Sequence, residues 1–217
     1  MRQAPRETPR LKQSPWTPTT ERGRQSRQRI LAAAERVFGQ KGYFPASITD
    51  ITREAGVAQG TFYVYFKSKR DVFVDVLESL GHLIRVAAKT AAQRAGNRIE
   101  AEERAFTAFF TLVNEHPYLY CIARQAEFVD PDAFRAWYSK IVDKYAKRLA
   151  EAIDREEIRS TDAETLAYCL LGIADFLGMR WPYWTRKPMP PKAFKAMMSF
   201  IRYGMDPARD QSKASSA

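Results

Sequence analysis

The residues best suited to do chemistry lie close together, between positions 47 and 70, and their types suit contact with nucleic acid. The amide of Gln59 can form paired hydrogen bonds with adenine, and the methyl group of Thr61 can contact the methyl group of thymine. Gly60 stands between them and lets a backbone approach DNA closely. With Tyr63 on the next turn, these residues predict a short segment that reads base edges.

Two short helices are needed to hold such a segment in place. Apolar residues at helical spacing predict a first helix over about 49–55, and Gly56 suits the positive φ at which a helix often ends. A second helix is predicted over about 58–66, where Phe62 and Phe66 are expected to pack inward and fix it. This is the layout of a helix-turn-helix, here 47–66, whose second helix lies in the major groove of DNA.

Residues at the edges of this unit suit the DNA backbone. Ser47 and Thr49 stand at the start of the first helix, where free N–H groups favour a phosphate, although simple capping is the alternative. Tyr65 and Lys69, at the end of the second helix and beyond it, are expected to reach phosphates. Such contacts position a protein on DNA and do not select a sequence.

The positive charge of the chain is concentrated in the same part of the sequence. The 217 residues carry a formal net charge of +10, and residues 1–70 hold fourteen Lys or Arg against five Asp or Glu. A basic region that coincides with a helix-turn-helix is the electrostatic footprint of nucleic-acid binding. Residues 1–23, rich in Pro and Arg, are predicted to form a disordered basic arm, which either follows DNA phosphates or is an inert tail.

The rest of the sequence shows helical periodicity and no strand-like alternation, so we predict an all-α protein of about nine helices. The helix-turn-helix is expected within an N-terminal domain over 24–84, whose first helix begins at Ser26. A C-terminal helical domain over 85–206 and a disordered tail over 207–217 follow.

Three motifs stand at fixed spacing between Ser26 and about Leu77: Phe38-x-x-x-Gly42-Tyr43, Thr49-x-Ile51-x-x-x-Ala55-Gly56-Val57 and Gly60-Thr61-x-Tyr63-x-Tyr65-Phe66. Through them this stretch resembles, without a gap, the N-terminal domain of the tetracycline-repressor (TetR) family. Lys69 then opens the fourth helix, and Val64 stands at a DNA-facing position where the family usually has a polar residue. The resemblance implies a DNA-binding transcriptional regulator, commonly a repressor.

A homodimer is expected on two grounds. One recognition helix reads few base pairs, so specific binding needs two half-sites, arranged as a palindromic operator. The family implies that the last two long helices, about 164–179 and 191–203, pack with those of a second copy into a four-helix bundle. Small residues such as Gly172 allow close helix approach, while part of this apolar surface is expected to serve the chain's own core.

The second domain is rich in aromatic residues, and helical bundles place small-molecule cavities between such helices. In the resembling family this cavity holds an effector. If Arg124 or Arg135 faces it, an anionic hydrophobic effector follows, such as a fatty acid or an acyl-CoA; ordinary core packing and satisfied salt bridges are the alternatives. The expected lining residues are Phe106, Phe109, Phe110, Tyr120, Arg124, Phe128, Arg135, Trp137, Tyr138 and Tyr168.

Other functions find less support in the sequence. His82 and His116 belong to no catalytic motif, and Cys121 and Cys169 show no CxxC spacing, so we expect no enzyme, no cofactor and no metal site. No apolar run is long enough to cross a membrane and no signal peptide is predicted, so a cytoplasmic protein is expected. The remaining alternative is a structural protein that binds DNA without sequence preference.

Overall fold

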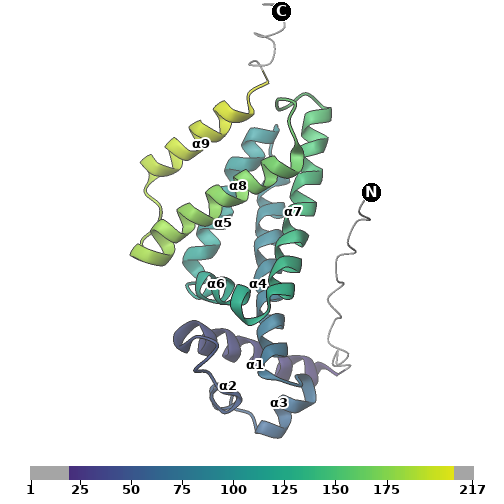
Figure 1. The fold of residues 1–217 in the computed structure, drawn as a ribbon, viewed down its shortest axis with the longest axis vertical. Coiled ribbons are helices and arrows are strands. Elements are labelled where there is room, and N and C mark those ends of the chain that lie inside the picture. The colour runs from purple at the N-terminus through teal and green to yellow at the C-terminus, as the bar shows by residue number, and fades with distance from the viewer. Residues whose placement is uncertain (1–19, 208–217) are drawn as a thin grey trace, which may run out of the picture. The chain divides into compact units, whose positions relative to one another are not determined.

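The computed structural model describes residues 20–207, and within that range the chain forms helices joined by loops, with no β-strand (Figure 1). The prediction of an all-α fold with about nine helices is confirmed. The elements are α1 (Glu21–Lys41), α2 (Ile48–Ala55), α3 (Gln59–Tyr65), α4 (Lys69–Ala92), α5 (Arg98–Glu115), α6 (Leu119–Val129), α7 (Pro131–Asp154), α8 (Ala163–Gly178), the π-helical segment η1 (Met179–Thr185) and α9 (Pro191–Met205).

These helices form two compact units. Among the described residues, the first unit contains residues 20–81 together with Tyr118–Ser139, and the second contains His82–Pro117 together with residues 140–207. The break after Gly81 lies close to the expected one after residue 84. The sequence-based division places residues 118–139 in the second domain, whereas in the structure they belong to the first unit.

Helix α1 begins earlier than the sequence indicates. Thr20 has an extended backbone, and its hydroxyl accepts a hydrogen bond from the N–H of Gly23 at 3.1 Å, so Thr20 caps the helix. Ser26, where the sequence predicts the helix to begin, lies inside α1. Residues 21–23, which the sequence assigns to the disordered arm, are therefore helical. The rest of that arm, residues 1–19, lies outside the described residues, as does the tail from 208 onward.

Aromatic side chains form the core of the first unit. Phe38, Phe62, Phe66 and Phe73 are all at most 2% exposed. The rings of Phe38 and Phe73 meet edge to face with centroids 5.2 Å apart, and the centroids of Phe62 and Phe66 are 5.5 Å apart. The prediction that Phe62 and Phe66 pack inward and hold α3 in place is therefore confirmed.

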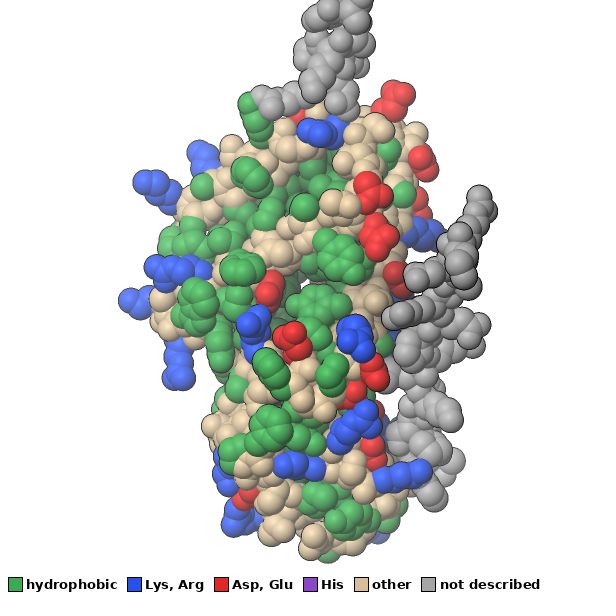
Figure 2. All heavy atoms as spheres, in the orientation of Figure 1, with side chains coloured by type: hydrophobic (Ala, Val, Ile, Leu, Met, Phe, Trp, Pro, Cys, Tyr) green, Lys and Arg blue, Asp and Glu red, His purple; other side chains and the backbone are tan. Residues whose placement is uncertain are grey.

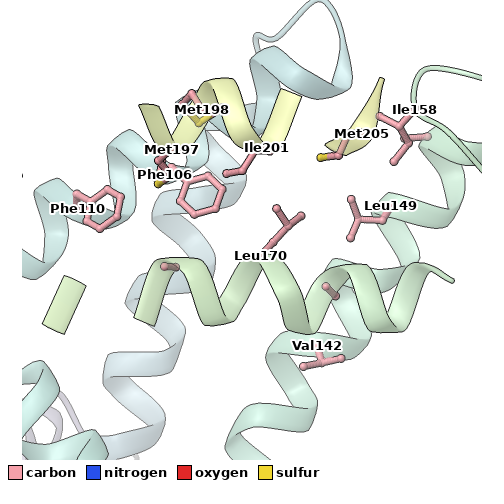
Figure 3. Packing of buried hydrophobic residues seen from close by; sticks show 13 residues of the cluster. Phe106, Phe110, Val142, Leu149, Ile158, Leu170, Met197, Met198, Ile201 and Met205 are labelled. Atoms are coloured by element: carbon pink, nitrogen blue, oxygen red, sulfur yellow. The ribbon is translucent and has the colours of Figure 1, made fainter. Parts of the chain in front are cut away.

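The core of the second unit is built from α5, α7, α8 and α9 (Figure 3). Side chains from these helices point toward one another and exclude water from the space between them. Methionines supply much of the contribution from α9, and their unbranched side chains adapt to irregular gaps. The labelled core residues are Phe106, Phe110, Val142, Leu149, Ile158, Leu170, Met197, Met198, Ile201 and Met205.

A buried polar cluster joins α5 to α7 in this unit. Glu102 is fully buried and accepts hydrogen bonds from the Arg98 guanidinium and from the Tyr145 hydroxyl. The guanidinium also lies over the Tyr145 ring, 5.7 Å from its centroid. Burial, followed by the neighbouring carboxylate, raises the pKa of Tyr145 well above its ordinary value. The phenol therefore remains a hydrogen-bond donor, and the buried carboxylate is satisfied on two sides.

Candidate nucleic-acid interface

The α2–α3 segment is fixed by a reciprocal cap and a left-handed turn. The Ser47 hydroxyl accepts a hydrogen bond from the N–H of Asp50, and the Asp50 carboxylate accepts one from the N–H of Ser47, each at 3.0 Å. Ser47 is thus the cap of α2, and Thr49 lies exposed in its first turn. Gly56 ends α2 with a φ of 64°, which confirms the predicted positive φ.

The Asp50 carboxylate also ties α1 to α2. It lies 2.8 Å from the Lys41 ammonium and 2.6 Å from the Arg53 guanidinium. Hydrogen bonds from Lys41 and Ser47 hold the pKa of Asp50 well below its ordinary value. The carboxylate is therefore charged at neutral pH, where it orients the start of α2.

Helix α3 has a buried side and a free side. Phe62 is fully buried, whereas Tyr63 is 53% and Val64 56% exposed, and Gln59 and Gly60 are exposed as well. No atom would lie within 4 Å of a β-carbon added at Gly60. Gln59, Gly60, Tyr63 and Val64 therefore share one accessible helix face. Thr61, which the sequence also predicts to read bases, is partly buried beside this face, as is Tyr65. Their contact with DNA stays a prediction.

Lys69 contacts the chain's own backbone, whereas the sequence predicts that it reaches a DNA phosphate. Its ammonium donates hydrogen bonds to the carbonyl oxygens of Tyr43, Phe44 and Ala46 at 2.9, 3.3 and 2.7 Å, and it lies 4.4 Å from the centroid of the Tyr43 ring. An ammonium group has three donors, so all of them are in use. Lys69 braces the connection between α1 and α2, and it has no donor left for the phosphate contact that the sequence predicts.

The structure adds contacts of α6 that the sequence did not indicate. The Tyr118 ring packs on Gly39 of α1, where an added β-carbon would lie 2.1 Å from the ring, and the Tyr118 hydroxyl accepts a hydrogen bond from Gln40 at 3.1 Å. The side-chain oxygen of Gln125 accepts a hydrogen bond from the N–H of Tyr43. The sequence offers one local indication that the Tyr118 ring packs so closely, which is the presence of a glycine, Gly39, inside a helix.

The residues predicted to line a ligand cavity are divided between the two units. Tyr120 and Trp137 are buried in the first unit, where Tyr138 packs edge to face on Trp137 with ring centroids 5.0 Å apart. Phe106 and Phe110 belong to the core of the second unit, and the partly buried Phe109 packs against it. Tyr168 is 51% exposed on α8 and therefore does not line an enclosed cavity.

Arg124 and Arg135 do not face a cavity as the sequence suggests. Both are exposed, and Arg135 pairs with Asp132 one turn away on α7. Phe128 is 75% exposed. Periodicity placed these residues on apolar helices, but they lie on the outer sides of α6 and α7. Trp137 offers a buried indole N–H that has no hydrogen-bond partner among the described residues.

The capped α2, the left-handed turn and the free face of α3 define a helix-turn-helix DNA-binding protein. Residues 30–76 match the family described as bacterial regulatory proteins, tetR family. The chain therefore carries a DNA-binding domain of the TetR family, and it is a transcriptional regulator and not an enzyme.

One sequence relative and one solved structure extend the similarity beyond the helix-turn-helix domain, whereas another relative matches a shorter stretch. The chain is 26% identical over 162 residues to the HTH-type transcriptional regulator YdgC of Bacillus subtilis, covering 72% of this chain and 80% of that one. It is 39% identical over 56 residues to the Fatty acid metabolism regulator protein of Bacillus subtilis, which covers 25% and 29% of the two chains. The crystal structure of the transcriptional regulator FadR from Bacillus subtilis in complex with stearoyl-CoA matches with a TM-score of 0.72 at 21% identity, covering 82% and 98%.

Residues 20–207 contain no helix with the length and apolar character needed to cross a membrane. The same residues hold no group of three or more His, Cys, Asp or Glu side chains placed to bind a metal ion.

Proposed function

We propose that the protein is a repressor that recognises a palindromic operator through α3 and leaves it when a small effector binds. The observation that carries the proposal is the free face of α3 on a firmly packed helix. Gln59 on this face suits adenine, and the exposed Val64 suits a thymine methyl group. Ser47 and Thr49 at the start of α2 suit the phosphates on either side of the bases that α3 reads.

The exposed surface of α8 and α9 supports a homodimer through these two helices. Figure 2 shows hydrophobic side chains gathered over these helices. Tyr168 and Phe176 of α8 are 51% and 66% exposed, and Phe200 and Tyr203 of α9 are 70% and 59% exposed. Gly172 lies between the two α8 aromatics and faces open space, which permits close helix approach. A second copy that uses the same two helices would cover this face and supply the second α3.

The effector that we propose is anionic and hydrophobic, such as a fatty acid or an acyl-CoA. Two of the matches, both from Bacillus subtilis, support this class: a sequence match named for fatty acid metabolism and a structure crystallised with stearoyl-CoA. In this chain, the second-unit core combines adaptable Met197, Met198 and Met205 with Phe106 and Phe110, which suits an aliphatic chain.

Helix α4 is the proposed route from effector to DNA. Its first two turns are attached to the DNA-binding helices through Lys69 and through the ion pair between Asp75 and Arg27 of α1. The same helix continues to Ala92, within the second unit. A change in the tilt of α4 would therefore alter the spacing of the two α3 helices. A tenfold change in operator affinity corresponds to about 1.4 kcal/mol.

Selection of genomic DNA fragments by the purified protein tests this function. We expect enrichment of fragments that share a palindrome whose half-sites lie about 34–36 Å apart along the DNA. Palmitoyl-CoA or stearoyl-CoA is expected to release the selected duplex in a gel shift and to raise the melting temperature of the free protein. Uniform recovery of genomic fragments would support the alternative, a structural protein that binds DNA without sequence preference.

A further inference from the structure

An open polar groove lies beside the helix-turn-helix, within the first unit. One wall is formed by Arg22, Ser26 and Arg29 of α1, which are spaced i, i+4 and i+7 and so share one face of that helix. The opposite wall contains Thr61 and Tyr65 of α3 and the turn between α2 and α3. The groove has a volume of about 460 Å³, enough for a phosphodiester group with part of its sugar.

No residue in the described range 20–207 neutralises the charges in this groove. Elsewhere on α1, Arg24 pairs with Glu21 at 2.7 Å and Arg36 pairs with Glu54 at 2.6 Å. Arg22 and Arg29 form no ion pair with any residue in the range 20–207, and no acidic side chain lines the groove. Two uncompensated guanidinium groups on one helix face create a local positive potential, which attracts an anion.

The neutral polar groups of the groove suit the same ligand. The hydroxyls of Ser26, Thr61 and Tyr65 have no hydrogen-bond partner within residues 20–207, so each can donate to a phosphate oxygen. Thr61 and Tyr65 belong to the helix that carries the free face, one turn apart. A DNA strand next to bases contacted by Gln59 and Tyr63 would therefore pass along this side of α3.

We propose that this groove binds a backbone phosphate of the DNA next to the bases that α3 reads, with Arg22 and Arg29 supplying the charge. The inference rests on the proposed function and extends the DNA contact from α2 and α3 to α1. Phosphate contacts are independent of sequence, and each one releases counterions, so the groove contributes to affinity and to salt dependence and not to the choice of operator.

The test compares Arg22→Gln, Arg29→Gln and the double variant with the wild type, and it uses Arg36→Gln as the matched control. The control loses the same charge from the same helix outside the groove. Binding to a selected operator and to a shuffled duplex is measured by fluorescence anisotropy between 50 and 300 mM salt. We expect each groove substitution to reduce the slope of log K against log salt by about 0.9, equally on both duplexes, while Arg36→Gln leaves the slope unchanged.

The outcomes separate this inference from the proposed function. The operator-to-shuffled affinity ratio of the wild type reports the proposed function, whereas the change of salt slope on either duplex reports the groove. An unchanged slope in the double variant overturns the inference, as does an absence of any DNA binding at 50 mM salt. The melting temperature in inorganic phosphate provides a further test. If phosphate raises it for the wild type but not for the double variant, while both proteins show the same salt slope on DNA, the groove binds free anions and its assignment to DNA is wrong.

Discussion

The guanidinium of Arg70, in the first turn of α4, lies 2.7 Å from the carboxylate of Asp130, the residue before α7. The same carboxylate accepts a hydrogen bond from the N–H of Ala133 at 3.2 Å, so Asp130 also caps α7, and it is only 5% exposed. One buried carboxylate therefore joins the start of α4 to the start of α7. This pair helps to explain why residues 118–139 belong to the unit that carries the helix-turn-helix.

The double role of Asp130 predicts different costs for its removal and for the removal of its partner. Asp130→Ala removes the cap and the ion pair together and is expected to lower the free energy of unfolding by about 1–3 kcal/mol. Arg70→Gln leaves the cap, and because the Arg70 side chain is 58% exposed, its loss is expected to cost about 1 kcal/mol or less. Urea unfolding followed by circular dichroism measures both, and equal costs would contradict the double role.

Two glycines are expected to respond to alanine in opposite ways. Gly39→Ala places a β-carbon 2.1 Å from the Tyr118 ring, so it should destabilise the protein although alanine favours helices. Gly60→Ala meets open space and is expected to leave the melting temperature unchanged or raised, but to weaken DNA binding because the new methyl group stands on the free face of α3. If Gly60→Ala binds the operator as tightly as the wild type, that part of α3 does not approach the DNA.

The lowered pKa of Asp50 predicts a stability contribution that depends on pH. Because its pKa is lower in the folded chain than the ordinary value of about 3.9, the carboxylate stabilises the fold above that value. The contribution diminishes as the pH falls below about 5 and is lost as the pH passes through the folded pKa. The difference in unfolding free energy between the wild type and Asp50→Asn should therefore be constant from pH 7 to 5 and shrink toward pH 2. A difference that grows on acidification would contradict the assigned direction.

The proposed dimer predicts that a charge on α8 separates the two copies. Phe176→Asp is expected to give monomers in sedimentation velocity at micromolar concentration and to weaken operator binding, because one α3 then reads one half-site. Phe128→Asp is the matched control, since Phe128 is 75% exposed but lies in the first unit. A dimeric Phe176→Asp variant, or dissociation of both variants, would argue against this interface.

The helix-turn-helix could be predicted from sequence because its determinants are local. Helical spacing, the cap at Ser47 and the positive φ of Gly56 depend on neighbouring residues, and the structure shows each of them. The bracing role of Lys69 could not be predicted, because its acceptors are carbonyl oxygens that lie 23 to 26 positions away and leave no mark on residue type.

The residues that line a ligand cavity could not be predicted from the sequence, for a related reason. Apolar periodicity identifies the helices of a bundle but does not show which side of a helix meets which neighbour. The sequence therefore predicts that Arg135 and Phe128 line a cavity, whereas both are exposed in the structure. The groove beside α3 could not be predicted either. The sequence shows that Arg22 and Arg29 are spaced i, i+7, but only the fold shows which acidic side chains lie close enough to neutralise an arginine.

The most direct test of the central claim is the affinity of the purified protein for a selected operator and for a shuffled duplex of equal length, measured at one salt concentration. The wild type is expected to prefer the operator by about 10³-fold or more. Gln59→Ala is expected to lose at least tenfold on the operator and to bind the shuffled duplex as before, because a lost base contact costs about 1–3 kcal/mol only where that base is present. Equal wild-type affinity for the two duplexes would contradict sequence-specific recognition through α3.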